Sequence, residues 1–411
     1  MNKKKIFNDP IYGFIEVPYP LLFDLLNHRY FQRLWRIRQL GMTHLVYPGA
    51  LHTRFQHAIG AMHLTHLAVE SLKSKGYSIS EDDAVSVCAA VLLHDIGHGP
   101  FSHALEKNLI FAGHEELSKL YMDKLNVELK GKLSTAIDIF SSTYPKKYLC
   151  RLVSGQLDMD RLDYLNRDSF FCGVTEGIIS SDRIIKMLEI TEDGLAVDAK
   201  GIYSVENFII ARRLMYWQVY LHKTVIAAEI LLVNILERAR QLIELKKDVF
   251  ATPALLIFLE RRLGVDDLRN SPELLEHFSE LDDFDVLTSI KLWSKNQDKI
   301  LSMLSANLIN RNLLRTEISD VAFDSAKIGD LKTKAQKKFQ VGEEESGFMV
   351  VTGNLENKAY NPLGDRINIV YKDGKVADIS EASDYLSISV LSKSVKKYFL
   401  CYPKELDDAS V

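Results

Sequence analysis

Histidine and aspartate side chains gather in one short stretch of the chain, where together they could bind a metal ion. Four of the twelve histidines lie between positions 94 and 114. His94 and Asp95 end an apolar run that starts at Cys88, which predicts a buried helix. Unpaired polar groups would be costly there, but a divalent cation accepts imidazole nitrogen and carboxylate oxygen as ligands. The alternative is a hydrogen-bonded pair at a helix end without a metal.

A second segment offers a further ligand. Arg54 and His57 are three residues apart and therefore share one face of a predicted helix. Small residues, among them Ala58 and Gly60, follow His57 and would allow another helix to approach closely. His57 is therefore a candidate third metal ligand.

A third segment carries a polar stripe. Asp160, Tyr164 and Asp168 recur at four-residue steps along one helical face, with Arg161 beside the first of them. Two carboxylates and a phenol on one face suit a ligand-binding helix. The alternative is a solvated acidic face with salt bridges, and we assign Asp158 and Asp163 to such a face.

The segment around His94 differs from the zinc-protease helix HExxH. His98 follows His94 by four residues, but the acidic residue next to His94 is an aspartate. Gly97 and Pro100 would also end a helix at this point. The pattern therefore does not favour a zinc protease.

Taken together, His57, His94-Asp95 and Asp160 resemble the H…HD…D signature of the HD phosphohydrolase superfamily. Longer strings between about residues 6 and 240 resemble its deoxynucleoside triphosphate (dNTP) triphosphohydrolase branch. These strings are Phe31-Gln32-Arg33-Leu34, Gln39-Leu40-Gly41, Tyr47-Pro48-Gly49-Ala50, Thr53-Arg54-Phe55-Gln56-His57, residues 94–103, residues 158–168 and Tyr220-Leu221-His222-Lys223.

The resemblance implies a metal-dependent enzyme that hydrolyses a dNTP to a deoxynucleoside and triphosphate. It assigns His57, His94, Asp95 and Asp160 as ligands of one divalent metal ion. Two imidazoles with two carboxylates suit Fe, Mn, Zn, Mg or Ni, so the sequence leaves the identity of the ion open.

The same resemblance places four further residues at the reacting phosphate. His103 and His114 match histidines near the α-phosphate, one of which acts as general acid or orients the attacking water. His98 matches a phosphate donor. Glu106 stands three residues after His103, at a position where the family often has aspartate.

Eight residues match substrate contacts of the family. Those matching phosphate contacts are Arg54, Arg161, Arg212 and Lys223. Those matching contacts to the sugar or base are Gln39, Tyr164, Asp168 and Tyr220. The alternative for the arginines is structural pairing with nearby carboxylates, and for Tyr220 a place in the core.

One departure from the family concerns activation by a guanine nucleotide. Members with that property use an acidic residue and an arginine near the start of the helical bundle. The matching residues here are Asn27 and Trp35, and a tryptophan cannot replace a guanidinium. We therefore expect no GTP-dependent assembly of that kind, but still expect a homo-oligomer, either a dimer or a tetramer.

The composition is that of an ordinary globular protein, with 411 residues, 47% hydrophobic and 26% charged. A net charge of -4 does not suit a protein that coats nucleic acid, although some nucleic-acid binding stays possible. We expect no membrane span and a cytoplasmic location. The widely spaced cysteines are expected as small core residues; they are Cys88, Cys150, Cys172 and Cys401.

The elements that must position these residues are mainly helical. We expect an N-terminal arm or strand pair over 1–20, an HD-domain helical bundle over 21–245, a helical extension over 246–335, and a small C-terminal α+β module over 336–411. Within that module, strands are expected at 347–352 and 367–371, the second followed by an Asp-Gly turn.

Two rival functions stay open. One is an HD phosphohydrolase acting on another nucleotide or on a phosphate monoester. The other is a catalytically inactive module that binds nucleotides or single-stranded nucleic acid. The intact set of ligands, together with His103, argues against the second.

Overall fold

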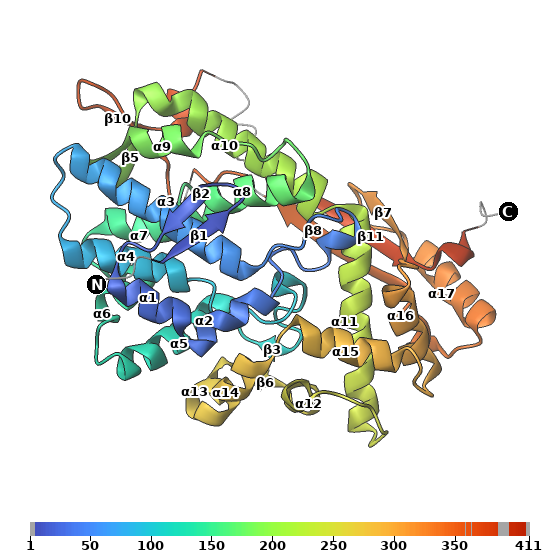
Figure 1. The fold of residues 1–411 in the computed structure, drawn as a ribbon. Coiled ribbons are helices and arrows are strands. Elements are labelled where there is room, and N and C mark those ends of the chain that lie inside the picture. The colour runs from blue at the N-terminus through green and yellow to red at the C-terminus, as the bar shows by residue number, and fades with distance from the viewer. Residues whose placement is uncertain (1–4, 358, 363, 385–393, 408–411) are drawn as a thin grey trace.

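The computed structural model describes residues 5–357, 359–362, 364–384 and 394–407, and in these ranges it is mainly helical (Figure 1). The predicted mainly α fold class is confirmed. Among the described residues, no single helix is both long and apolar enough to cross a membrane. The bent pair Ala199–Tyr220 and Lys223–Glu244 passes that test only jointly, on length and composition.

The chain begins with the predicted strand pair. β1 (Ile6–Asp9) and β2 (Gly13–Glu16) are antiparallel, and Gly13 takes a positive φ of 74° in the turn between them. Two helices follow, α1 (Pro20–Asn27) and α2 (Arg29–Gln32), then 3₁₀ turns at Arg33–Arg36 and Thr43–Leu45.

Three helices carry the candidate metal ligands, and α3 (Arg54–Ser74) packs against the other two, α4 (Glu81–Leu93) and α8 (Met159–Cys172). Each begins at a capping residue. Gln56 Oε1 accepts from the backbone N–H of Thr53, Asp83 and Ser80 form a capping box, and Asp158 accepts from the N–H of Arg161. The caps fix where each helix starts, and with it the direction of the ligands.

Gly60 allows α3 and α8 to approach closely. A Cβ on Gly60 would lie 2.0 Å from Asp163 Oδ1 and 2.2 Å from Arg167 Nη2. The predicted close approach of another helix beside His57 is therefore confirmed, and Gly60 is where it occurs.

Further helices surround these three, and α10 runs through a π-helix toward the long helix α11 (Figure 1). Their bounds are α5 (His114–Glu128), α6 (Ser134–Phe140), α7 (Lys147–Val153), α9 (Ser181–Met187), α10 (Ile202–Met215), the π-helix Tyr216–Tyr220 and α11 (Lys223–Glu244).

The expected helical extension follows α11 and packs against it and against the ligand-bearing part of the chain. A short parallel pair, β3 (Ile110–Phe111) with β6 (Leu263–Gly264), joins the two parts. The helices in the expected range 246–335 are α12 (Pro253–Glu260), α13 (Val265–Asn270), α14 (Pro272–Glu280), α15 (Asp283–Trp293), α16 (Lys299–Ile309) and most of α17 (Ser325–Phe339). The short helix α18 (Glu343–Ser346) lies beyond that range.

Two strands of residues 336–411 pair with strands from outside that segment. β9 (Asn368–Val370) lies parallel to β5 (Gly194–Asp198), in the order β10-β9-β5-β4. β11 (Val395–Tyr402) lies between β7 (Arg315–Ser319) and β8 (Val351–Asn357). The remaining elements are β4 (Leu188–Thr191), β10 (Val376–Asp378) and α19 (Ile379–Ala382). The division into four units stays a prediction, and these pairings tie its last unit to the two before it.

One strand starts later than expected. Residues 347–350 turn back onto α18, because the N–H groups of Met349 and Val350 both donate to the carbonyl of Ser346, and β8 starts only at Val351. The predicted Asp-Gly turn is confirmed between β9 and β10, with Gly374 at a φ of 85°.

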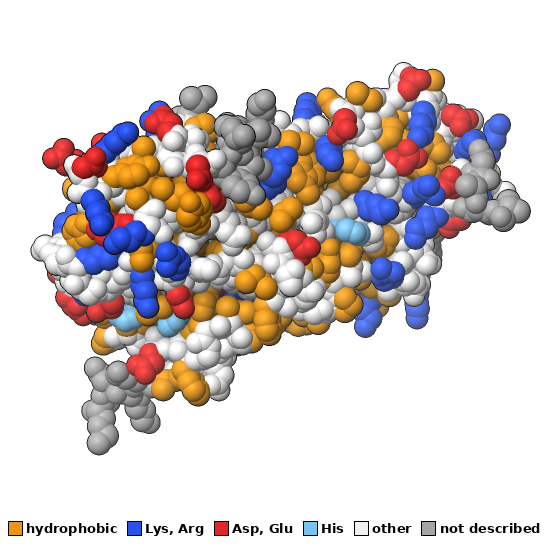
Figure 2. Space-filling view, turned by 90° about the horizontal axis from the view of Figure 1, so that it is seen from above, with side chains coloured by type: hydrophobic (Ala, Val, Ile, Leu, Met, Phe, Trp, Pro, Cys, Tyr) orange, Lys and Arg blue, Asp and Glu red, His pale blue; other side chains and the backbone are white. Residues whose placement is uncertain are grey.

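The four cysteines are free and buried, as expected. Over the face seen in Figure 2, acidic, basic and hydrophobic side chains are interspersed. Charge of one sign does not cover that face.

Candidate functional site

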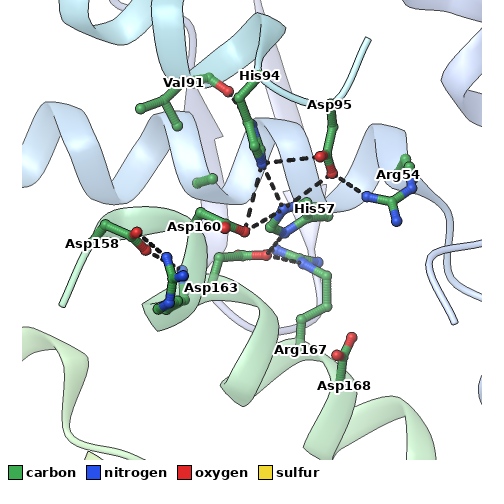
Figure 3. A network of polar contacts seen from close by, with 12 residues as sticks. Arg54, His57, Val91, His94, Asp95, Asp158, Asp160, Asp163, Arg167 and Asp168 are labelled. Atoms are coloured by element: carbon green, nitrogen blue, oxygen red, sulfur yellow. Dashed lines mark hydrogen bonds and ion pairs between the residues drawn. The ribbon is translucent and has the colours of Figure 1, made fainter. Parts of the chain in front are cut away.

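The predicted metal ligands converge at one point between α3, α4 and α8 (Figure 3). His57 Nε2 lies 3.3 Å from His94 Nε2 and 3.1 Å from Asp160 Oδ1. Asp95 places one carboxylate oxygen 3.4 Å from His94 Nε2 and the other 3.5 Å from His57 Nε2. Ligand atoms about 2.1 Å from a tetrahedral ion lie about 3.4 Å apart. The spacing therefore fits a metal ion held by His57, His94 and Asp160, with Asp95 in contact with both histidines.

Hydrogen bonds behind the two imidazoles fix their orientation. His57 Nδ1 donates to Asp163 Oδ2 at 2.7 Å, and His94 Nδ1 donates to the Val91 carbonyl at 2.6 Å. With Nδ1 protonated in each ring, the neutral tautomer leaves a lone pair on Nε2 directed at the site. This is the arrangement that a metal-binding histidine requires.

Asp163 corrects the sequence-based expectation. It was assigned with Asp158 to a solvated acidic face, but both side chains are fully buried. Asp163 accepts from Arg167 at 2.8 and 2.9 Å as well as from His57, and Arg167 also pairs with Asp9 at 2.7 Å. Asp163 therefore supports a metal ligand from behind.

The network carries an unbalanced charge. Two guanidinium groups accompany four carboxylates, which leaves two negative charges; the groups are Arg54 and Arg167 with Asp9, Asp95, Asp160 and Asp163. Buried charge of this size requires compensation. One divalent cation would balance it.

In the absence of a metal ion, His57 binds a proton more tightly than a free imidazole does. Burial disfavours the charged form of His57, but hydrogen bonds to Asp160 and Asp163 outweigh it and raise the pKa of His57 to about 10. A metal ion must displace that proton, so metal affinity is expected to rise with pH through the neutral range.

The site is open on one side. The His57 side chain is fully buried, whereas that of Asp160 is 26% exposed and that of His94 is 11% exposed. Water and a substrate can therefore reach the metal position past His94 and Asp160.

Three more histidines lie beside this opening. His98 Nε2 is 3.3 Å from Asp95 Oδ1, and its ring stacks on that of His114 with centroids 3.9 Å apart. Glu106 accepts from His103 Nδ1 at 2.7 Å and from His114 Nδ1 at 2.9 Å. The three rings run from buried His98 to His103, whose side chain is 66% exposed. The predicted grouping of these four residues is thus present in the structure.

The cluster borders a hollow in the surface. A pocket of about 330 Å³, open to solvent, is lined by His98, Glu106, His114 and Phe278, among others. The Nδ1 atoms of His103 and His114 are engaged by Glu106, so their Nε2 atoms remain available to a bound group. This arrangement can bind an anion or transfer a proton beside the metal position.

Arg54 is committed to the metal ligands rather than exposed to solvent. It is buried, pairs with Asp95, and donates from Nε to Ser102 Oγ at 2.7 Å. Burial opposes ionisation of Asp95, but the positive charge of Arg54 outweighs it and holds the pKa of Asp95 well below its usual range. The phosphate contact expected of Arg54 stays a prediction.

The residues expected at the sugar form a second network. Asp168 accepts from His52 Nε2 and from the Tyr220 hydroxyl, both at 2.8 Å. Tyr164 meets Tyr220 edge to face, with centroids 6.3 Å apart. His52 thus helps to orient Asp168.

The other residues predicted to contact the substrate do not form a single network with Asp168 among the described residues. Gln39 is buried, and its Oε1 has no hydrogen-bond partner among the described residues. Arg161 pairs with Asp158, and Arg212 donates to the Ala359 carbonyl at 3.2 Å. Lys223 is exposed at the start of α11, and no contact among the described residues links it to the metal ligands. Its phosphate contact stays a prediction.

Replacing Asp163 with asparagine should weaken metal binding by about 10- to 100-fold, because the amide lacks the charge that supports His57. The measurement is a metal titration of each metal-free protein. Asp83→Asn is the control: that carboxylate is equally buried and caps α4 at its other end. Both variants should lose stability, and unchanged affinity in Asp163→Asn would contradict this role.

The fold and site define the class of protein. An "HD domain" family model matches residues 54–165, and an "HD associated region" matches 179–252. The first contains all four predicted ligands. The chain belongs to the HD phosphohydrolase superfamily.

Within that superfamily, three relatives are informative. A crystal structure of a phosphohydrolase from Bacteroides thetaiotaomicron is 51% identical, with a TM-score of 0.94 over 97% of this chain and 100% of that one. The uncharacterized protein YwfO of Bacillus subtilis is 31% identical over 99% of this chain and 94% of its own length. Human deoxynucleoside triphosphate triphosphohydrolase SAMHD1 is 30% identical over 53% of this chain and 42% of its own length.

Proposed function

We propose that this protein is a metal-dependent dNTP triphosphohydrolase, which converts a dNTP and water to a deoxynucleoside and triphosphate. The observation that carries the proposal is the open edge of the ligand cluster, at His94 and Asp160, beside the histidine cluster of His98, His103 and His114. Similarity to SAMHD1 supports the choice of substrate.

The metal ion would be held by His57, His94, Asp95 and Asp160, and when bound it would lower the pKa of a coordinated water to make a nucleophile. Fe, Mn, Zn, Mg and Ni all suit this ligand set. His98 and His114 would orient the phosphate chain. His103, the most exposed of the three rings, would give its proton to the leaving oxygen, with Glu106 holding the ring.

On the sugar side, Asp168 and Tyr220 would hold the deoxyribose, since their hydrogen bond fixes both side chains. Gln39 offers a buried amide oxygen without a partner, which suits a sugar hydroxyl or a base edge. Arg161 and Arg212 would neutralise phosphate charge, joined by Lys223 and Arg54.

The proposal also covers the oligomeric state and activation by GTP. We propose a homo-oligomer, a dimer or a tetramer, acting in the cytoplasm on free dNTPs. The ring of Trp35 stacks on that of Phe55 with centroids 3.9 Å apart, and the Asn27 amide donates to the Phe23 carbonyl. Neither side chain supplies a charge for a guanine nucleotide, so GTP should not be required.

The test is a panel of the four dNTPs, each incubated with the metal-loaded protein, with and without GTP. Stoichiometric tripolyphosphate and deoxynucleoside are expected for at least one dNTP in the absence of GTP. Release of inorganic phosphate or pyrophosphate would indicate an HD phosphohydrolase of another specificity. Binding without turnover would indicate an inactive nucleotide-binding module.

Wild-type protein should prefer deoxyribose to ribose triphosphates, because Tyr164 matches a family residue that crowds the 2' position of the sugar. Tyr164→Ala should relax this preference while metal content stays unchanged, because the Tyr164 ring packs on Tyr220 and its hydroxyl forms no hydrogen bond to a predicted metal ligand among the described residues. The measurement compares kcat/KM for dGTP and GTP, with Tyr203→Ala, an exposed tyrosine on α10, as control. Equal values of kcat/KM for dGTP and GTP in the wild-type protein would contradict this role of Tyr164.

A further inference from the structure

The segment Leu281–Asp283, at the start of α15, lies outside both family matches. It contacts residues that precede His57 in the chain and a residue that follows Asp95. Buried Arg33 donates from Nη1 to the Leu281 carbonyl at 3.1 Å and from Nη2 to the Ile96 carbonyl at 3.0 Å. Ile96 directly follows the ligand Asp95. The helical extension is thus joined by hydrogen bonds to the turn that carries a predicted ligand.

Asp283 makes the most direct of these contacts. Its Oδ1 accepts from the backbone N–H of Phe101 at 2.7 Å, and its Oδ2 accepts from the N–H of Arg38 at 3.1 Å. The side chain is 3% exposed, and no Lys or Arg side chain of the described residues forms an ion pair with it. A carboxylate buried in this way depends on these two backbone donors.

The backbone that Asp283 holds is strained. Phe101 and Ser102 both have a φ of 55°, in the left-handed region that non-glycine residues adopt only at a cost in free energy. Such a conformation persists where the surroundings fix it. Asp283 supplies the bond to the first of the two residues, and His103 follows immediately after the second.

The contacts continue to the metal position. Ser102 Oγ donates to the Arg38 carbonyl at 2.6 Å and accepts from Arg54 Nε at 2.7 Å. Arg54 in turn pairs with Asp95. The loop fixed by Asp283 therefore sets the direction of His103 on one side and supports a predicted ligand on the other.

We propose that Asp283 is a positioning residue for the loop Gly99–His103, which makes the helical extension a working part of the active centre. The proposal deepens the function proposed above and rests on it for its effect on turnover. Asp283 touches neither the metal position nor His103; it acts through the backbone of Phe101 and Arg38.

The test variant is Asp283→Asn, which keeps the shape of the side chain but sets an amide donor against one of the two N–H groups. Asp298→Asn is the matched control, because Asp298 caps α16 in the same extension and contacts Arg238 instead of the loop. Three quantities are measured: hydrogen exchange of peptides covering 97–104, metal content, and kcat with KM.

In Asp283→Asn the 97–104 amides should exchange about tenfold faster or more, and kcat should fall about tenfold or more, with metal content and KM close to wild type. Asp298→Asn should change neither exchange nor kcat. Unchanged exchange in Asp283→Asn would overturn the proposal, as would faster exchange across the whole chain. Exchange needs no substrate, so it remains decisive even if wild-type protein hydrolyses no dNTP.

Discussion

Replacing His94 or Asp95 with alanine is expected to remove the metal ion and to lower turnover by on the order of 10³-fold or more. Each variant deletes a ligand atom that lies 3.3 to 3.5 Å from the Nε2 of His57. Each also leaves the remaining carboxylate and imidazole groups buried without the cation that balances them. Elemental analysis of the purified protein and the dNTP assay measure the two effects.

The control for this experiment is His66→Ala. His66 lies on α3 as His57 does, but its ring packs edge to face on Tyr19, 5.7 Å away between centroids. This variant should keep both metal and turnover. Full metal content together with full turnover in His94→Ala or Asp95→Ala would show that the ligands are assigned incorrectly.

Replacing His103 with asparagine is expected to lower kcat by about 10²- to 10⁴-fold, the usual loss when a general acid is removed. Metal content should not change, because the His103 ring contacts Glu106, His98 and His114 and none of the four ligands. Steady-state kinetics and elemental analysis of the purified variant measure the two quantities.

His277→Asn provides a matched control. His277 is also an exposed histidine with a glutamate three residues later, Glu280 at 3.5 Å, but it lies on α14. This variant should leave kcat unchanged. A His103→Asn protein with wild-type kcat would remove His103 from the proposed chemistry and leave His114 as the candidate acid.

The candidate metal ligands could be located from sequence because local features mark them. His94 and Asp95 end an apolar helix, and His57 shares a helical face with Arg54, so each segment signals its place independently of the others. Their order along the chain then matched a known signature. The structure brings His57, His94 and Asp160 together, with Asp95 in contact with both histidines.

The residues that support the ligands could not be predicted in the same way. Asp163 looks like part of an acidic helix surface until α8 is known to pack against α3 at Gly60, where its carboxylate is enclosed between His57 and Arg167. That contact joins residues 106 positions apart. An aspartate with an arginine four residues later was the available signal, and a surface ion pair gives the same pattern.

The pairing partners of the C-terminal strands could not be predicted from sequence, for a similar reason. Their alternation and the turn at Gly374 are local, and the hairpin of β9 and β10 was predicted from them. Their partners are not local: β9 pairs with β5, about 170 residues earlier in the chain, and β11 pairs with β7 as well as β8. The same long-range packing places Asp283 against the loop that carries His103.

The measurement that tests the proposed reaction most directly is hydrolysis of a dNTP in water enriched in ¹⁸O, with mass analysis of both products. Attack of water on the α-phosphorus breaks its bond to the 5'-oxygen of the sugar. One ¹⁸O atom is therefore expected in the tripolyphosphate and none in the deoxynucleoside. Tripolyphosphate without label would contradict attack at the α-phosphorus, and label found only in inorganic phosphate or pyrophosphate would contradict a dNTP triphosphohydrolase.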